Sequence, residues 1–238
     1  MKKCLSLMLA LVMVFGLAAC GAKPAETQPA TDAPSVQPVT EVPTQAPTEP
    51  PAQTGMMVDT CILKEADDKM LNTYTLLAVD PQAPFTDADG NAVSDVAVNT
   101  AGADALIQWF LSQEALDLAG NYGFEEYGEY LFYVKDGAPV YSGEIAHATE
   151  ETKVIRLSTT TSVKDSGLLG YLLPVFESAY GYTVEVQSAG TGKAISAAKF
   201  GNADLILVHA KSQEEAFVED GFARVVEGFQ SERISFLY

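Results

Sequence analysis

Short apolar strands alternate with helical segments between residues 154 and 238, and this alternation constrains the fold more than any other feature. Residues 154–159 read as a strand, and apolar side chains at helical spacing predict a helix over residues 166–180, ended by Gly181. Further strands are expected at residues 183–187, 203–208 and 233–238, with helices at 192–200 and 212–220. This pattern predicts an α/β fold, in which helices cover both faces of a mostly parallel sheet.

The preceding part of the chain, residues 56–150, has a less regular pattern. We expect a strand at 74–79, a loop or hairpin around 87–91, helices at 100–111 and 113–122, and a last strand at 130–134. Residues 143–152 read as a joining segment. The acidic stretch 87–95 lacks the spacing and closing Glu of a calcium loop, so it predicts a polar turn and no metal site.

Residues 1–19 have the features of an export signal. Lys2 and Lys3 precede an apolar run over residues 5–19, which is shorter than the roughly 20 residues that span a bilayer. The run ends in Leu-Ala-Ala-Cys-Gly, which resembles the lipobox of bacterial lipoproteins, with Cys20 as the acylated residue. An ordinary cleaved signal with a chance cysteine is the alternative.

Residues 20–55 form a lipid-anchored linker in this interpretation. They hold eight of the twelve prolines, interspersed with Thr, Ala, Gln and Glu, and such a composition cannot bury a core. We therefore expect the protein at the cell membrane, held by its lipid on the extracytoplasmic face. Cys61 is then the one free cysteine, either a reactive thiol or a small buried apolar residue.

The charge of the chain limits its partners. The formal net charge is −18, and loss of the signal with its two lysines makes it −20. Such a charge argues against nucleic acid, whose binding depends on cationic contacts to phosphate, and against adhesion to anionic lipid. An anion site in this chain must therefore be built locally from hydrogen-bond donors.

Four hydroxyl residues, Thr159, Thr160, Thr161 and Ser162, follow the strand at 154–159. Ligands bind α/β sheets at the carboxyl ends of their parallel strands, where helix N-termini also direct free N–H groups. Hydroxyls and amides together can donate to an oxyanion. The alternative is a polar turn that only caps the next helix.

A second group of donors follows the next strand, in Ser-Ala-Gly-Thr-Gly-Lys at 188–193. Gly190, Thr191 and Gly192 allow a ligand close approach to the backbone, although the spacing is not that of a P-loop. His209 ends a third strand and either lines the same site or has no ligand role. The full set of candidate ligand residues is Thr159, Thr160, Thr161, Ser162, Ser166, Gly190, Thr191, Gly192 and His209.

No acceptor is required at this site, which favours an ion that stays unprotonated: tungstate, molybdate or sulfate. Phosphate near neutral pH carries a proton and needs an acceptor, and Asp165 lies nearby in the sequence. No cofactor or metal is expected. No serine has a histidine in a triad-like context, so an enzyme is not expected.

Several motifs resemble, in order, the start of the tungstate-binding proteins of ABC transporters. They are Leu-Ser-Thr-Thr-Thr-Ser at 157–162, Asp-Ser-Gly-Leu-Leu at 165–169, Leu-Pro-Val-Phe-Glu at 173–177, Gly-Thr-Gly-Lys-Ala at 190–194 and Ala-Asp-Leu-Ile-Leu-Val-His-Ala at 203–210. The resemblance implies a type II periplasmic-binding-protein fold that closes on an oxyanion. It assigns the turns at 159–162 and 190–192 to the ligand and implies an ABC permease as partner.

The first half of the folded part resembles the other end of the same family. Residues 69–81, 105–123 and 126–133 are similar to the family's return from the second lobe and to its closing helices. We therefore expect essentially one lobe in circularly permuted order: residues 56–150 correspond to the family's C-terminal part, and residues 151–238 to its N-terminal part. Most of the second lobe, including its ligand-binding Arg, has no counterpart.

The sequence thus predicts an extracytoplasmic lipoprotein that binds a tetrahedral oxyanion, tungstate first, for ABC-transporter uptake. Phosphate, sulfate or molybdate on the same fold are alternatives. A surface interaction or sensor module, or a truncated remnant, is another.

Overall fold

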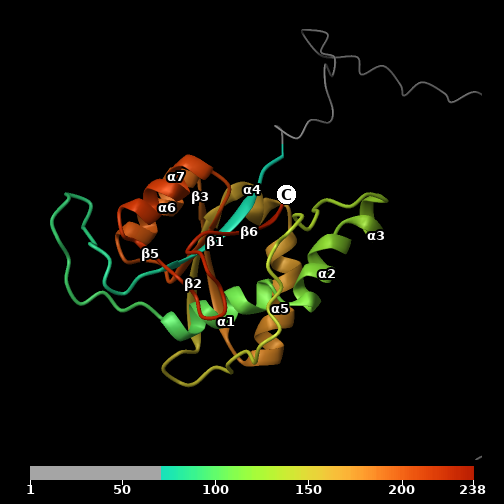
Figure 1. Ribbon diagram of the computed structural model, residues 1–238, viewed down its shortest axis with the longest axis horizontal. Helices are drawn as coiled ribbons and strands as arrows, with labels where there is room; N and C mark the ends of the chain where they lie inside the picture. The colour runs from blue at the N-terminus through green and yellow to red at the C-terminus, as the bar shows by residue number, and fades with distance from the viewer. Residues whose placement is uncertain (1–70) are drawn as a thin grey trace, which may run out of the picture. The chain divides into compact units, whose positions relative to one another are not determined.

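The computed structural model describes residues 71–238, and Figure 1 shows their arrangement. The predicted signal peptide, the lipidated Cys20, the linker and Cys61 lie outside these residues and stay predictions. Within residues 71–238, no helix combines the length and the apolar character that crossing a bilayer requires.

One sheet organises the described residues. Its order is β3 (Thr183–Ala189), β2 (Val154–Thr160), β4 (Leu205–Val208), β1 (Tyr74–Val79) and β5 (Ala223–Arg224), and β6 (Ile234–Leu237) also pairs with β1. Strand β2 runs parallel to β3 and β4, whereas β1 runs antiparallel to β4, β5 and β6. The first half of the folded part therefore supplies a strand to the sheet of the second half.

Helices cover both faces of the sheet, as predicted (Figure 1). Because side chains alternate along a strand, Leu76 and Ala78 of β1 face one core, and Leu77 and Val79 face the other. The first core includes residues of α1 (Thr100–Phe110), α2 (Gln113–Asn121) and α5 (Leu168–Tyr180). The second includes residues of α6 (Thr191–Lys199) and α7 (Lys211–Glu219). The α/β fold class is confirmed.

Three local predictions differ from the structure. The expected strand at 130–134 is only an isolated bridge from Val134 to Leu237, and the Leu131 N–H donates to the Tyr122 carbonyl at 3.0 Å, outside the sheet. The hydroxyl turn continues into a short helix, α4 (Thr161–Asp165), and another short helix, α3 (Phe124–Tyr127), was not expected. Helix α5 begins after Gly167, whose left-handed φ of 81° separates it from α4.

A buried carboxylate ties the two halves together. Asp204, at the start of β4, is fully buried and accepts from the backbone N–H of Asn99 at 2.9 Å and of Arg156 at 2.7 Å. The Arg156 guanidinium pairs with it at 2.6 Å. Asn99 in turn caps α1 through Gly102 and donates to the carbonyls of Thr152 and Val154. These contacts fix β2 and β4 against α1.

Candidate functional site

The ends of three parallel strands meet at one edge of the sheet. Thr160 of β2 lies beside Ala189 of β3 in register, and Thr159 lies beside Leu207 of β4. Helices α4, α6 and α7 each begin within a few residues of these strand ends. The three groups of predicted ligand residues, 159–162, 190–192 and His209, therefore come together as expected from the strand order. We call this group the strand-end site.

A chain of hydrogen bonds links two of the strand ends. The Thr160 hydroxyl lies 3.1 Å from the Ser162 hydroxyl, and Ser162 Oγ lies 3.0 Å from His209 Nε2. Thr160 is buried, whereas Thr161 and Ser162 are exposed and His209 is half-buried. Thr161 and Ser162 are therefore the hydroxyls that a ligand can reach directly.

Two predicted ligand residues have their hydroxyl protons engaged elsewhere. Thr159 is fully buried and its Oγ1 donates to the Leu207 carbonyl at 2.7 Å, so it fastens β2 to β4. Ser166 Oγ donates to the Val163 carbonyl at 2.8 Å and accepts from Leu168 N at 3.3 Å, so it joins α4 to α5. Both side chains support the strand-end site and have no proton left for an anion.

The N-terminus of α6 supplies backbone donors to the site. Gly190 precedes the helix with a φ of −62° and a ψ of 150°, and no side chain of the described residues caps α6. The first N–H groups of a helix lack partners within the helix, so those of Thr191 and Gly192 are directed at this edge of the sheet. A Cβ atom on Gly190 would meet no protein atom within 4 Å, which leaves the approach to these groups open.

The Ser162–His209 pair was missed by sequence reasoning, because 47 residues separate its members. A serine beside a histidine is the first step of a nucleophile–base arrangement. Among residues 71–238, however, no carboxylate contacts His209, and its ring packs against Tyr74, with the ring centroids 5.3 Å apart. Burial raises the pKa of the Tyr74 phenol, so this neighbour stays uncharged near neutral pH. The orienting acid of a catalytic triad is thus missing from the described residues.

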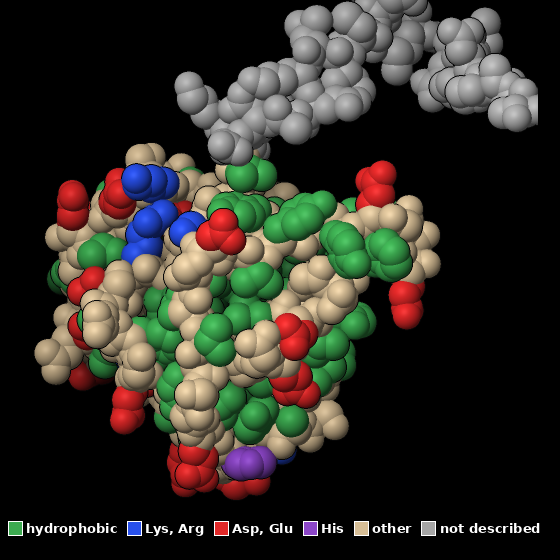
Figure 2. Space-filling view, turned by 45° about the vertical axis from the view of Figure 1, so that its right-hand side comes forward, with side chains coloured by type: hydrophobic (Ala, Val, Ile, Leu, Met, Phe, Trp, Pro, Cys, Tyr) green, Lys and Arg blue, Asp and Glu red, His purple; other side chains and the backbone are tan. Residues whose placement is uncertain are grey.

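A hollow of about 460 Å³ lies beside the strand-end site and shares His209 with it. Lys135, Lys211 and Arg233 line it, together with Asn72, Thr73 and Ser235. We call it the basic pocket. Figure 2 shows Lys and Arg side chains gathered on one face of the molecule. The three cations of the basic pocket come from distant parts of the sequence, so no local motif could have revealed the pocket.

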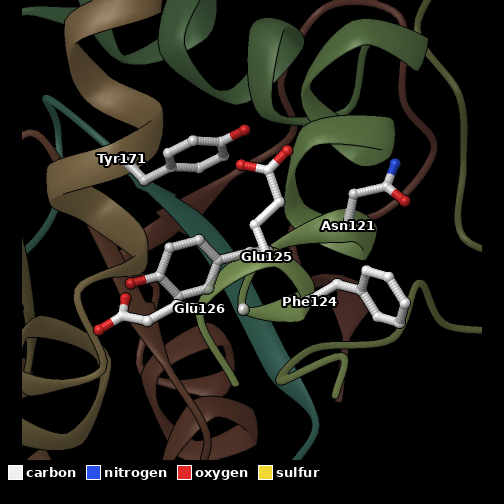
Figure 3. Close-up of a pocket in the computed structure, with 7 residues that line it drawn as sticks. Asn121, Phe124, Glu125, Glu126 and Tyr171 are labelled. Atoms are coloured by element: carbon white, nitrogen blue, oxygen red, sulfur yellow. The ribbon is translucent and has the colours of Figure 1, made fainter. Parts of the chain in front are cut away.

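A second hollow, of about 420 Å³, has the opposite character. Figure 3 shows Glu125, Glu126 and Tyr171 around it, and its other lining residues belong to the segment 121–124. Carboxylates at this position repel anions, so this hollow does not compete for the proposed ligand class. Among residues 71–238, no group of three or more His, Cys, Asp or Glu side chains is arranged to hold a metal ion.

Comparison with known proteins finds relatives over part of the chain. Residues 146–233 match the PBP superfamily domain. Over 79 residues the chain is 47% identical to the tungstate-binding protein TupA of Peptoclostridium acidaminophilum, an alignment that covers 33% of this chain and 27% of the relative. The chain therefore spans about a quarter of the length of the curated relatives that it matches.

Two solved structures extend the comparison. The tungstate-binding protein TupA of Desulfovibrio alaskensis G20 is 40% identical, with 29% of this chain and 27% of that chain covered and a TM-score of 0.28. The tungstate ABC transporter structure from Geobacter sulfurreducens is 46% identical, with 29% and 30% covered and a TM-score of 0.29. The likeness thus rests on the sequence of a short shared segment. The proteins it identifies are named for binding and transport rather than for catalysis.

Proposed function

We propose that this chain, with its PBP superfamily domain at residues 146–233, is an anion receptor that binds tungstate at the strand-end site. The observation that carries the proposal is the meeting of two donor groups at one edge of the sheet. Thr161 and Ser162 come from the end of β2, and the uncapped N-terminus of α6 comes from the end of β3.

The chemistry of these donors selects an anion that needs no acceptor. Hydroxyl and amide donors stabilise negative charge at a helix N-terminus, and the dipole of α6 adds to this effect. Asp165, the last residue of α4, lies three positions after Ser162 and is the acceptor that a protonated phosphate would need, whereas the donors of the site are hydroxyls and amides. Tungstate, molybdate and sulfate are dianions at neutral pH and fit such a site better than protonated phosphate does. A relative named for tungstate binding supports testing tungstate first among them.

The biological setting forms the second part of the proposal. The lipobox-like sequence at Cys20 and the linker over residues 20–55 support anchoring at the extracytoplasmic face of the membrane. An ABC permease is the expected recipient of the anion, because an anion-binding protein of an ABC transporter is among the relatives. The single sheet shared by β1 and β2–β6 is compatible with the permuted order of the two halves.

Calorimetric titration of the purified full chain with tungstate, molybdate, sulfate and phosphate tests the proposal. We expect saturable binding, with tungstate tightest. The Ser162→Ala variant removes one donor to a charged ligand, which is worth about 1.5–3 kcal/mol, so its affinity should fall at least about tenfold. Thr183→Val is the matched control, because Thr183 is exposed at the opposite end of β3. Equal affinities for Ser162→Ala and the unaltered chain would contradict the proposal.

A further inference from the structure

The basic pocket is unusual for a chain of this charge. The chain carries a net charge of −18, yet three cations, Lys135, Lys211 and Arg233, line one hollow of about 460 Å³. Among residues 71–238, none of the side chains that line it is acidic. The cations come from the segment before residue 136, from the first turn of α7 and from the start of β6, so the fold itself brings them together. Glu214 and Glu215 pair with Arg233 and Lys211 from outside this lining, and the described lining itself carries only positive charge, which favours an anion there.

Each cation retains capacity to bind an anion. Arg233 is held by Glu214, which is fully buried and accepts from Arg233 Nε at 2.6 Å, and this bond leaves the far side of the guanidinium uncommitted. Lys211 pairs with Glu215 at 3.7 Å, and both side chains are largely exposed, so this pair is weak. Within residues 71–238, the hydrogen bond of Lys135 Nζ is a long one to the Asp136 carbonyl, at 3.5 Å. The pocket therefore has one positioned guanidinium and two ammonium groups that are free to turn toward a ligand.

Neutral donors complete the lining. Ser235 lies in β6, and its hydroxyl is 2.9 Å from the hydroxyl of Thr75. Helix α7 begins at Lys211, and no side chain among the described residues caps it. His209 borders both this pocket and the strand-end site. The pocket is thus lined by side-chain cations, the hydroxyls of Thr73 and Ser235, the Asn72 amide and an imidazole.

We propose that the basic pocket is a second anion-binding site, distinct from the strand-end site, and that it takes a small anion with two linked phosphate-like groups. One guanidinium and two ammonium groups can donate to two linked phosphate-like groups at once. A volume of about 460 Å³ also exceeds what a single tetrahedral ion fills. This site does not require the proposed tungstate binding, because its cations lie outside the strand-end site.

Titration of the full chain with inorganic diphosphate, in the absence of divalent metal, tests this inference. We expect saturable binding that weakens at least about threefold in Lys135→Gln and in Lys211→Gln, and that weakens further at higher salt. Lys153→Gln is the control: it removes the same charge at the start of β2, at the opposite end of the sheet, and should leave the affinity unchanged. Ser162→Ala should retain diphosphate binding, which separates this site from the strand-end site.

Three results would overturn the inference. The first is no diphosphate binding by the folded chain. The second is an equal loss of affinity in the Lys135, Lys211 and Lys153 variants, which would indicate a general charge effect. The third is loss of diphosphate binding in Ser162→Ala with full binding in the lysine variants, which would place diphosphate at the strand-end site. Tungstate titration of the same variants tests the proposed function separately, because tungstate affinity should not follow Lys135 or Lys211.

Discussion

Replacement of Asp204 by alanine should destabilise the fold more than alanine at any other buried polar residue of the sheet. The carboxylate is fully buried and accepts four hydrogen bonds: one from Asn99 N, one from Arg156 N and two from the Arg156 guanidinium. The Asp204→Ala variant leaves all four donors without this acceptor. It therefore loosens the contact between β2, β4 and the start of α1.

The size of the stability loss depends on how many of the hydrogen-bond donors around Asp204 keep another partner. Breaking a buried ion pair by removing one partner costs about 3–5 kcal/mol. Arg156 keeps its bonds to the carbonyls of Gly201 and Ala97, and its side chain is 28% exposed, so water recovers part of the loss. We therefore expect a loss of about 3 kcal/mol in the free energy of unfolding. For a domain of this size, that corresponds to a fall of roughly 6–12 °C in Tm.

Urea unfolding followed by circular dichroism measures this loss. The matched control is Asp220→Ala, which removes an ion pair of similar length, 2.7 Å to Lys199, from a side chain that is 55% exposed. Asp220→Ala should lower the free energy of unfolding by less than about 1 kcal/mol, because exposed ion pairs contribute little to stability. A loss below about 1 kcal/mol for Asp204→Ala, with an unchanged urea m-value, would refute the reasoning.

Three further predictions concern single positions. Gly192→Ala should raise the free energy of unfolding by about 0.5 kcal/mol in urea titrations, because alanine favours the helix α6 and the new Cβ would lie no closer than 3.8 Å to Gln213 of α7. Gly201→Ala should lower the free energy of unfolding by about 2 kcal/mol, because φ is 75° there and the Cβ would overlap Val96. Gly221→Ala is its control: φ is 77° but the space is open, so the free energy of unfolding should fall by about half as much. Burial raises the pKa of Asp104, so its contribution to stability is full below its ordinary value of 3.8 and is lost as the pH rises through the raised pKa. The stability of the chain relative to Asp104→Asn should therefore fall as the pH rises above 3.8, and a rise over that range would contradict this.

The sequence predicted the parallel part of the sheet well, because its signals are local. Strand β4 is a continuous apolar run, and β2 ends in hydroxyl residues. Gly181 adopts a φ of 78° and ends α5, as expected for a glycine after a helix. Each of these features can be recognised within a few residues of the chain.

Other features depend on contacts between distant residues and could not be predicted from the sequence. Helix α4 is five residues long and mostly polar, so it has no apolar period to reveal it. The sequence does not show that the Thr159 hydroxyl donates to Leu207, and so it could not separate this supporting residue from the exposed Thr161. The basic pocket could not be predicted for the same reason, since Lys135 and Arg233 are far apart in the chain.

A crossed comparison of two threonines in the titration with tungstate tests the central claim most directly. Thr161 is exposed at the strand-end site, whereas Thr159 is buried with its hydroxyl bonded to β4. The account predicts that Thr161→Val lowers tungstate affinity at least about tenfold and leaves the free energy of unfolding within about 0.5 kcal/mol. It predicts that Thr159→Val lowers the free energy of unfolding by about 1–3 kcal/mol, with tungstate affinity retained in the folded fraction. Unchanged tungstate affinity in Thr161→Val would contradict the claim that the end of β2 binds the anion.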